Sequence, residues 1–159
     1  MDRFCFRPAE ESDALLIAQL RQQIWNTTYR NIYPDEVIDG FDPAWHERRN
    51  LEWIRSWNVY VVEADRKPVG YLIFREDDPL YLQSLYLLQE WQGKGGGRQA
   101  FALLKARCSA LGVRSIRFQC SPWNENALSC YLHMGARIIR REEGHENKQE
   151  DTLWLELSV

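Results

Sequence analysis

A dense run of glycines follows an apolar stretch near the middle of the chain. Four glycines fall within five residues, and they are Gly93, Gly95, Gly96 and Gly97. Glycine has no Cβ, so the backbone here can take positive φ angles and a ligand can approach the main chain closely. The residues that follow are typical of a helix, whose first N–H groups are unpaired and lie at the positive end of its dipole. With Lys94 and Arg98 beside them, these groups predict a site for a phosphate or pyrophosphate.

Three other interpretations of the glycine run are weaker. The span 95–100 formally satisfies the dinucleotide pattern G-x-G-x-x-G/A, but that fold needs an acidic residue about 20 residues later, at the end of the next strand. The strand predicted there, at 113–119, contains no acid. The P-loop pattern G-x-x-x-x-G-K-[ST] is absent from the sequence. A plain connection between a strand and a helix has no need of four glycines.

A second group of residues lies downstream, at 124–135. Its spacing is N-x-x-A-x-x-x-Y-x-x-x-G, which places Ala127 and Tyr131 four residues apart and therefore on one face of a helix. A tyrosine in such a helix is, by itself, more typical of packing than of catalysis. Its combination with the glycine run at this separation is far more specific.

The elements that must position these groups follow from the hydrophobic pattern. Strands are predicted at 4–7, 59–64, 69–74, 80–88, 113–119, 136–141 and 152–157. Helices are predicted from an N-cap at Ser12 to about Trp25, from Pro43 to about Trp57, from about Gly97 to Leu111, and from Asn124 to Met134. Gly112 is suited to end the third helix, and residues 31–42 are predicted to form a loop with one short helical turn. No linker or repeat interrupts this order, which predicts one domain over residues 1–159.

Composition narrows the class of protein. The chain has 159 residues, of which 45% are hydrophobic and 27% charged, as is ordinary for a globular domain. A net charge of −3 does not favour nucleic-acid binding, and no apolar run approaches the ~20 residues of a membrane span. The N-terminal sequence lacks the apolar core of a signal peptide, and the four cysteines show no CxxC spacing. We therefore expect a cytoplasmic protein with no nucleic-acid partner, no membrane partner and no metal.

Taken together, the two motifs resemble those of the GCN5-related N-acetyltransferase (GNAT) superfamily. Residues 92–97 match that family's Q/R-x-x-G-x-G/A signature, with Gly96 where an aliphatic residue is commoner, and residues 124–135 are similar to its downstream helix. The order of predicted elements agrees over nearly the whole chain. The resemblance implies an α/β (α+β) fold with a mixed, mostly antiparallel sheet of about seven strands and about four flanking helices.

The same resemblance implies an activity and roles for individual residues. An acetyl group would move from acetyl-CoA to a primary amine by direct attack in a ternary complex. Backbone groups of Leu85 and Leu87 would pair with the pantetheine arm like an added strand, and a main-chain N–H there would polarise the thioester carbonyl. Asn124 would hydrogen-bond that arm or order water, and Tyr131 would protonate the leaving thiolate. The pyrophosphate would lie on the signature residues, which are Gln92, Gly93, Lys94, Gly95, Gly96, Gly97 and Arg98.

One departure from the family concerns the general base. Gln119 occupies a position where some relatives have glutamate, and glutamine cannot accept a proton. Either another carboxylate acts through ordered water, with Asp35, Glu36 and Glu63 as candidates, or the amine arrives already neutral. The departure also keeps an alternative open, namely a non-catalytic acyl-CoA-binding sensor or interaction module. A dinucleotide-dependent oxidoreductase is a distant third.

The acceptor is predicted only in outline, as a small-molecule or peptide amine. Residues 25–36 resemble a loop-and-helix segment in a subset of the family, some of which acetylate polyamines. Aromatic faces and carboxylates suit a cationic amine, so the predicted acceptor-binding residues are Trp25, Tyr29, Tyr33 and Glu36. Protein N-termini, lysines, polyamines, aminoglycosides and small amino compounds all fit this outline. A homodimer is a further expectation, because many relatives are dimers.

Overall fold

The protein is built on one seven-stranded sheet, whose strand order is β1-β2-β3-β4-β5-β7-β6. The computed structural model describes residues 4–144, 146 and 150–159. The strands are β1 (Phe4–Pro8), β2 (Asn58–Ala64), β3 (Lys67–Arg75), β4 (Leu80–Leu87), β5 (Ser115–Cys120), β6 (Arg137–Glu142) and β7 (Thr152–Ser158). Neighbouring strands are antiparallel except for β4 and β5, which are parallel. The predicted mixed, mostly antiparallel sheet is confirmed.

Five α-helices accompany the sheet among the described residues. They are α1 (Ala14–Ile24), α2 (Asp35–Asp39), α3 (Pro43–Ser56), α4 (Gly96–Leu111) and α5 (Glu125–His133). The start of α3 is as predicted, because Pro43 takes the first helical position and the Asp42 carboxylate accepts the Ala44 N–H at 3.1 Å. Gly112 ends α4 with φ +72°, also as predicted. The single helical turn expected within 31–42 is α2.

Both ends of the first helix differ from the prediction. Ser12 is not its N-cap, because Glu11–Asp13 forms a 3₁₀ turn ahead of α1 and the Glu10 N–H donates to the Asp13 carboxylate at 2.8 Å. The helix also does not stop at Trp25. A π-helical turn, Trp25–Tyr29, continues it, and such turns are frequent at functional sites.

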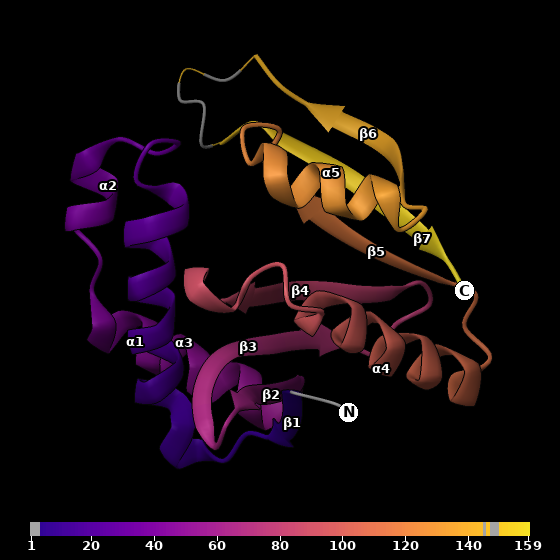
Figure 1. Ribbon diagram of the computed structural model, residues 1–159, viewed down its shortest axis with the longest axis horizontal. Helices are drawn as coiled ribbons and strands as arrows, with labels where there is room; N and C mark the ends of the chain where they lie inside the picture. Colours follow the sequence, from indigo (N-terminus) through magenta and orange to yellow (C-terminus); the bar gives the residue numbers. More distant parts are fainter. Residues whose placement is uncertain (1–3, 145, 147–149) are drawn as a thin grey trace.

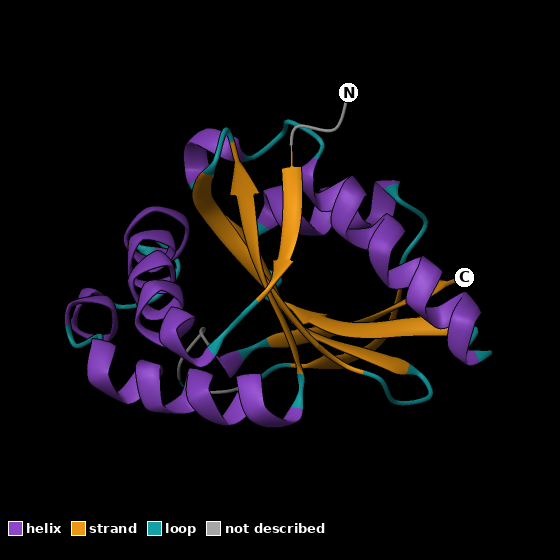
Figure 2. Ribbon diagram, turned by 90° about the horizontal axis from the view of Figure 1, so that it is seen from below, coloured by secondary structure: helices purple, strands orange, loops and turns teal. Residues whose placement is uncertain are grey.

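Helices cover both faces of the sheet, as Figure 2 shows. On one face, Ile17, Leu20 and Ile24 of α1 pack with Tyr71 and Ile73 of β3, and α3 lies beside α1. On the other face, α4 and α5 share a second core with the side chains that alternate with these along β3. That core includes Leu72, Phe74, Phe101, Leu104 and Phe118. Side chains of successive strand residues point to opposite faces, so β3 can anchor both layers.

The parallel pair β4 and β5 is short, and this shapes the centre of the sheet. Pairing runs only from Leu80 with Ile116 to Leu82 with Phe118, after which the two strands separate (Figure 1). At that point β4 carries a bulge, because Phe74 pairs with Leu82 and Ile73 pairs with Ser84, which leaves Gln83 as the extra residue. Residues 83–87 therefore have β3 on one side and no strand on the other.

Two further observations concern the described residues, 4–144, 146 and 150–159. None of their helices combines the length and the hydrophobicity that a membrane crossing requires. Their His, Cys, Asp and Glu side chains form no group of three or more that could hold a metal ion.

Candidate active site

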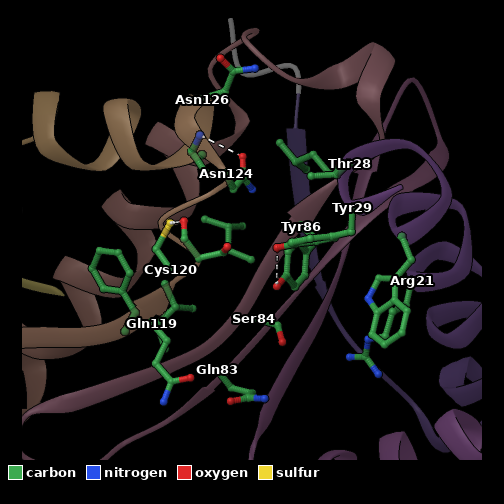
Figure 3. Close-up of a pocket in the computed structure, with 18 of the residues that line it drawn as sticks. Arg21, Thr28, Tyr29, Gln83, Ser84, Tyr86, Gln119, Cys120, Asn124 and Asn126 are labelled. Atoms are coloured by element: carbon green, nitrogen blue, oxygen red, sulfur yellow. Dashed lines mark hydrogen bonds between the residues drawn. The ribbon is translucent and has the colours of Figure 1, made fainter. Parts of the chain in front are cut away.

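A cleft of about 1000 Å³ opens where β4 and β5 separate. Its lining comes from both faces of the sheet. Arg21 and Trp25 belong to the α1 side, whereas Gly93, Gly97 and Ala127 belong to the glycine turn and α5. Figure 3 shows Arg21 and Tyr29 on one wall, Gln119 and Cys120 on the opposite wall, and β4 side chains between them. The cleft therefore joins the two layers of the protein through the opened sheet.

The free edge of β4 forms the floor of the cleft. Leu85 and Leu87, which the sequence singled out, both line it. The backbone of 83–87 meets no second strand there, so it can accept an extended ligand as an added strand. The Leu87 carbonyl already accepts the Gln92 side-chain amide at 3.0 Å. Gln92 thus ties the start of the glycine turn to the end of the strand.

The glycine turn depends on glycine for two separate reasons. Gly93 and Gly95 have φ values of +73° and +93°, in the left-handed region that disfavours other residues. Gly96 is instead favoured by packing, because a Cβ there would lie 2.8 Å from a Leu87 methyl carbon and 3.1 Å from the Phe4 ring, so both side chains would have to shift. The Gln99 N–H donates to the Gly95 carbonyl at 3.0 Å, so the N–H groups of the three residues before Gln99 precede the hydrogen-bonded turns of α4.

The signature residues are divided between the lining of the cleft and the surface around it. Gln92, Gly93 and Gly97 line the cleft, whereas Lys94, Gly95, Gly96 and Arg98 do not. The Lys94 ammonium lies 5.0 Å from the centre of the Trp91 ring, and Arg98 is exposed. Both cations are therefore placed beside the start of α4 rather than inside the cleft.

Tyr131 lines the cleft from α5. This helix begins because the Asn124 side chain, which also lines the cleft, accepts the Ala127 N–H at 3.4 Å. The Tyr131 ring packs edge-on against Phe118, with 4.8 Å between ring centres. Burial raises the pKa of the Tyr131 hydroxyl above its ordinary value, so the hydroxyl keeps its proton. That hydroxyl makes no hydrogen bond with any described residue. Every fully buried side-chain oxygen of those residues does have a partner, so the Tyr131 hydroxyl is accessible from the cleft.

Aromatic side chains line the other half of the cleft. The predicted acceptor residues Trp25, Tyr29 and Tyr33 are brought together, with Tyr29 stacked on Tyr33 at 4.9 Å between ring centres. The Tyr29 hydroxyl donates to that of Tyr86 at 3.2 Å, and burial raises the pKa of both phenols. Tyr86 was not singled out from the sequence. The available signal was its position directly before Leu87, because neighbouring residues of a strand point to opposite faces.

The acidic residues expected beside these aromatics are placed elsewhere. Glu36 lies in α2 and does not line the cleft. Asp35 pairs with Arg30 at 3.4 Å, and Glu63 pairs with Arg7 at 3.5 Å, so neither faces the cleft. Gln119 does line it, and Asp151 is the one carboxylate among the described lining residues.

A buried arginine faces the same half of the cleft. Arg21 donates from Nε to the Tyr71 hydroxyl at 2.9 Å and from Nη1 to the Asn50 side-chain oxygen at 3.2 Å. Nη1 also lies 3.3 Å from His46 Nδ1. Burial, and then the Arg21 charge, lower the pKa of His46 to about 4, so its ring is neutral at pH 7. The sequence did contain a sign that Arg21 is buried, because Arg21 lies four residues after Ile17 and therefore on the apolar face of α1.

A match to a protein-family model identifies the family of this chain. The family model described as the Acetyltransferase (GNAT) family matches residues 19–136, which include the glycine turn and the whole of α5. The chain belongs to the GNAT family. This GNAT chain is thus an acetyltransferase, and acetyl-CoA is its acyl donor. The family that the two motifs predicted is confirmed.

Solved structures show the same fold for this GNAT protein over its full length. The PaiA N-acetyltransferase of Thermoplasma acidophilum, in complex with coenzyme A, is 18% identical with a TM-score of 0.82, covering 100% of both chains. A GCN5-related N-acetyltransferase of Rhodopseudomonas palustris is 17% identical with a TM-score of 0.81, covering 100% of this chain and 98% of its own. The yncA protein of Salmonella typhimurium, with its cofactor acetyl-CoA, is 20% identical with a TM-score of 0.63, covering 99% and 94%. A comparison with curated protein sequences gives no match.

Proposed function

We propose that this protein is a single-domain N-acetyltransferase that moves the acetyl group of acetyl-CoA to a primary amine by direct attack in a ternary complex. The observation that carries the proposal is the cleft between β4 and β5, which is lined from both faces of the sheet. Two substrates that enter from opposite faces can meet there without exchanging places. A ternary complex needs such an arrangement, because donor and acceptor must be bound together.

The residues present fit the donor. Acetyl-CoA supplies the thioester whose acetyl group is transferred. The unpaired backbone of 83–87 offers hydrogen bonds to an extended amide chain, with Leu85 and Leu87 as the contact residues. The glycine turn offers N–H groups without helical acceptors to a pyrophosphate, and Lys94 and Arg98 add positive charge beside it. We assign Asn124 to the same site, since it lines the cleft next to α5.

Tyr131 is assigned the proton that the leaving sulfur needs. In the reaction the amine nitrogen bonds to the thioester carbonyl carbon, the carbon–sulfur bond breaks, and the proton lost by nitrogen balances the one gained by sulfur. The Tyr131 hydroxyl is protonated and open to the cleft, so it can donate to sulfur and recover a proton afterwards. A main-chain N–H of β4 would hold the carbonyl oxygen as negative charge develops there.

The amine is proposed to bind in its neutral form. Gln119 cannot take a proton, and the three carboxylates considered as bases, Asp35, Glu36 and Glu63, do not line the cleft. Asp151 does line it but is not a free carboxylate, because it already takes part in another interaction. A relay through Cys120 is disfavoured as well, because burial raises the pKa of the Cys120 thiol to about 11. That thiol is protonated at neutral pH and is a poor nucleophile.

The Tyr131→Phe variant tests the proposal. Release of free CoA is measured across a panel of amines, and acetyl-CoA affinity is measured by calorimetry. Turnover should fall by a factor on the order of 10²–10⁴ while acetyl-CoA affinity stays the same. Tyr60→Phe is the matched control, because Tyr60 stacks on Phe74 and does not line the cleft.

Two outcomes would contradict the proposal. Wild-type turnover in Tyr131→Phe would remove the tyrosine from the mechanism. Tight acetyl-CoA binding by the parent without turnover of any amine would favour the acyl-CoA sensor.

A further inference from the structure

Arg21 is a buried cation without a carboxylate partner. The residue is 5% exposed, and none of its contacts with the described residues involves an aspartate or glutamate. Charged groups that lose their water are normally paired with an opposite charge, because burying an isolated ion is expensive. Arg21 lies on the cleft wall, so a ligand can supply the missing charge.

Neutral groups hold the guanidinium in a fixed position. The Tyr71 hydroxyl, the Asn50 side-chain oxygen and His46 Nδ1 lie within 2.9–3.3 Å of its nitrogens. Asn50 is itself fixed, because its amide donates to the Ala14 carbonyl at 2.9 Å. The guanidinium carbon also lies 4.9 Å from the centre of the Tyr71 ring and 5.4 Å from that of Trp53. The charge is therefore preorganised, and none of these contacts neutralises it.

One nitrogen of Arg21 remains for a ligand. Nε and Nη1 make the hydrogen bonds described above, and Nη2 makes none with the described residues. Every fully buried side-chain nitrogen of those residues has a hydrogen-bond partner, so Nη2, which has none, is accessible from the cleft. Figure 3 places Arg21 across the cleft from Gln119 and Cys120.

The other charged groups nearby do not offset Arg21. Arg49 adds a second positive charge at the cleft, lying over Trp53 at 5.0 Å, and is 3.7 Å from Glu52. His46 is neutral at pH 7, since its pKa is about 4. Asp151 lines the cleft beside Thr152, at the start of β7, but it forms no ion pair with Arg21 and already takes part in another interaction. Asp35 and Asp39 of α2 pair with Arg30, and Glu36 does not line the cleft, so these three acids do not form a binding site for a polyamine there.

The donor does not supply the counter-charge either. Arg21 packs on Tyr71 on the α1 face, together with Tyr86. The glycine turn lies against Leu87, which follows Tyr86 and points to the opposite face. The phosphate site and Arg21 are therefore on different sides of β4.

We propose that the acceptor amine carries a carboxylate and that Arg21 binds this carboxylate. The inference rests on the proposed N-acetyltransferase function and names its substrate class. Trp25, Tyr29 and Tyr33 line the same half of the cleft, so the rest of the acceptor is apolar or aromatic. The class is thus a free α-amino acid, or a similar amino-carboxylate, with an apolar or aromatic side chain.

Matched pairs of substrates test the proposal on the parent protein. Phenylalanine is compared with phenylalaninamide and phenethylamine, and spermidine serves as the polycation. Amidation lowers the amine pKa toward about 7.7–8.0, which supplies more neutral amine and favours faster reaction of the amide. A kcat/KM higher for phenylalanine than for phenylalaninamide therefore supports carboxylate recognition. Equal or higher values for the amide or for spermidine would overturn it, while leaving the N-acetyltransferase intact.

One further substrate distinguishes a free amino acid from a peptide as the acceptor that carries the carboxylate. A peptide amide that begins Phe-Asp carries its carboxylate on a protein-type acceptor. Acetylation of this peptide at the rate of free phenylalanine would retain the role of Arg21 but would assign the carboxylate to a peptide.

Two variants separate recognition from a structural role. Arg21→Gln should raise KM for phenylalanine by about 10- to 100-fold, the range of a charged hydrogen bond, and change KM for phenylalaninamide by less than about twofold. Tyr71→Phe releases Nε and should give a smaller change in the same direction. Arg55→Gln is the control, because Arg55 lies in the same helix as Asn50, pairs with Glu11 and does not line the cleft. Equal losses for acid and amide would assign Arg21 to stability alone.

A binding measurement covers the remaining outcomes. Calorimetry with N-acetylphenylalanine and its amide, in the presence of CoA, needs no turnover and no variant. Tighter binding of the acid supports the carboxylate site even if no amine is acetylated, in which case only the proposed N-acetyltransferase function fails. Equal binding of the two compounds would overturn the inference.

Discussion

The glycine turn makes a prediction in which stability and ligand binding change in opposite directions. Gly97 is helical, and a Cβ added there would meet no atom within 4 Å. Alanine at a helical position is favoured over glycine by roughly 0.5–1 kcal/mol, which for this chain length raises Tm by about 1–4 °C. The added methyl would nevertheless lie at the cleft, where we propose that the pyrophosphate of the donor approaches the backbone. Gly97→Ala should therefore be more stable than the parent and bind acetyl-CoA more weakly.

Two other glycines provide the comparison. Gly95 and Gly112 have φ values of +93° and +72°, and both have open space where a Cβ would be placed. Alanine at either position costs about 1–2 kcal/mol of backbone strain, so both variants should melt several degrees lower. Gly95 precedes α4 at the donor site, whereas Gly112 ends the same helix at its far end. Only Gly95→Ala should weaken acetyl-CoA binding.

Thermal melting and calorimetric titration with acetyl-CoA are sufficient for all three variants. The three glycines differ in their φ angles and in their distance from the proposed donor site. Melting therefore measures the backbone strain that each alanine introduces, and titration measures its effect on acetyl-CoA binding. Unchanged affinity in a folded, stabilised Gly97→Ala would refute the donor site. So would a loss of affinity in Gly112→Ala equal to that in Gly95→Ala, because the effect would then come from α4 as a whole.

Two further predictions concern pH. The acetylation rate should rise with pH up to the pKa of the acceptor amine, because the amine must lose its proton before it attacks, and Asp35, Glu36 and Glu63 do not line the cleft. A flat profile under conditions where chemistry limits the rate would contradict this. His46 has a folded pKa of about 4 against 6.5 when unfolded, so the unfolded chain binds more protons between these values and stability falls as the pH falls through that range. The loss is on the order of 1 kcal/mol after allowance for partial exposure, and melting curves of His46→Gln should depend less on pH across that window.

The parts of the fold that depend on local chemistry could be predicted from the sequence. Pro43 and Gly112 mark helix ends because their backbones are constrained by the residue itself. The strands follow from runs of apolar and β-branched residues. The π-helical continuation past Trp25 was not predictable in this way, because tertiary packing of Tyr29 on Tyr86 supports it. The bulge at Gln83 likewise depends on the register between β3 and β4.

The candidate site shows the same division. The glycine turn and Tyr131 stand in motifs of fixed spacing, so both could be singled out from the sequence. Glu36 was expected among the acceptor residues, but the residue type does not determine where its side chain points. In the fold, Glu36 lies in α2 and does not line the cleft. Arg21 was missed because its environment is made by α3 and β3, whose Asn50 and Tyr71 lie 29 and 50 residues away in sequence. Burial without a counter-ion is a property that only the assembled fold possesses.

The separation of β4 from β5 also has a thermodynamic consequence for the protein in the cell. A strand edge inside a sheet leaves backbone groups that a partner strand would otherwise satisfy, and we have proposed that the donor completes this edge. Any ligand that binds only the folded chain stabilises it, by about 2.7 kcal/mol at 100 times its Kd. The conformational stability of this protein should therefore rise with the concentration of acetyl-CoA. When acetyl-CoA is withdrawn, the protein should lose its substrate and part of its conformational stability together, and the edge of β4 at 83–87 is then left without a partner.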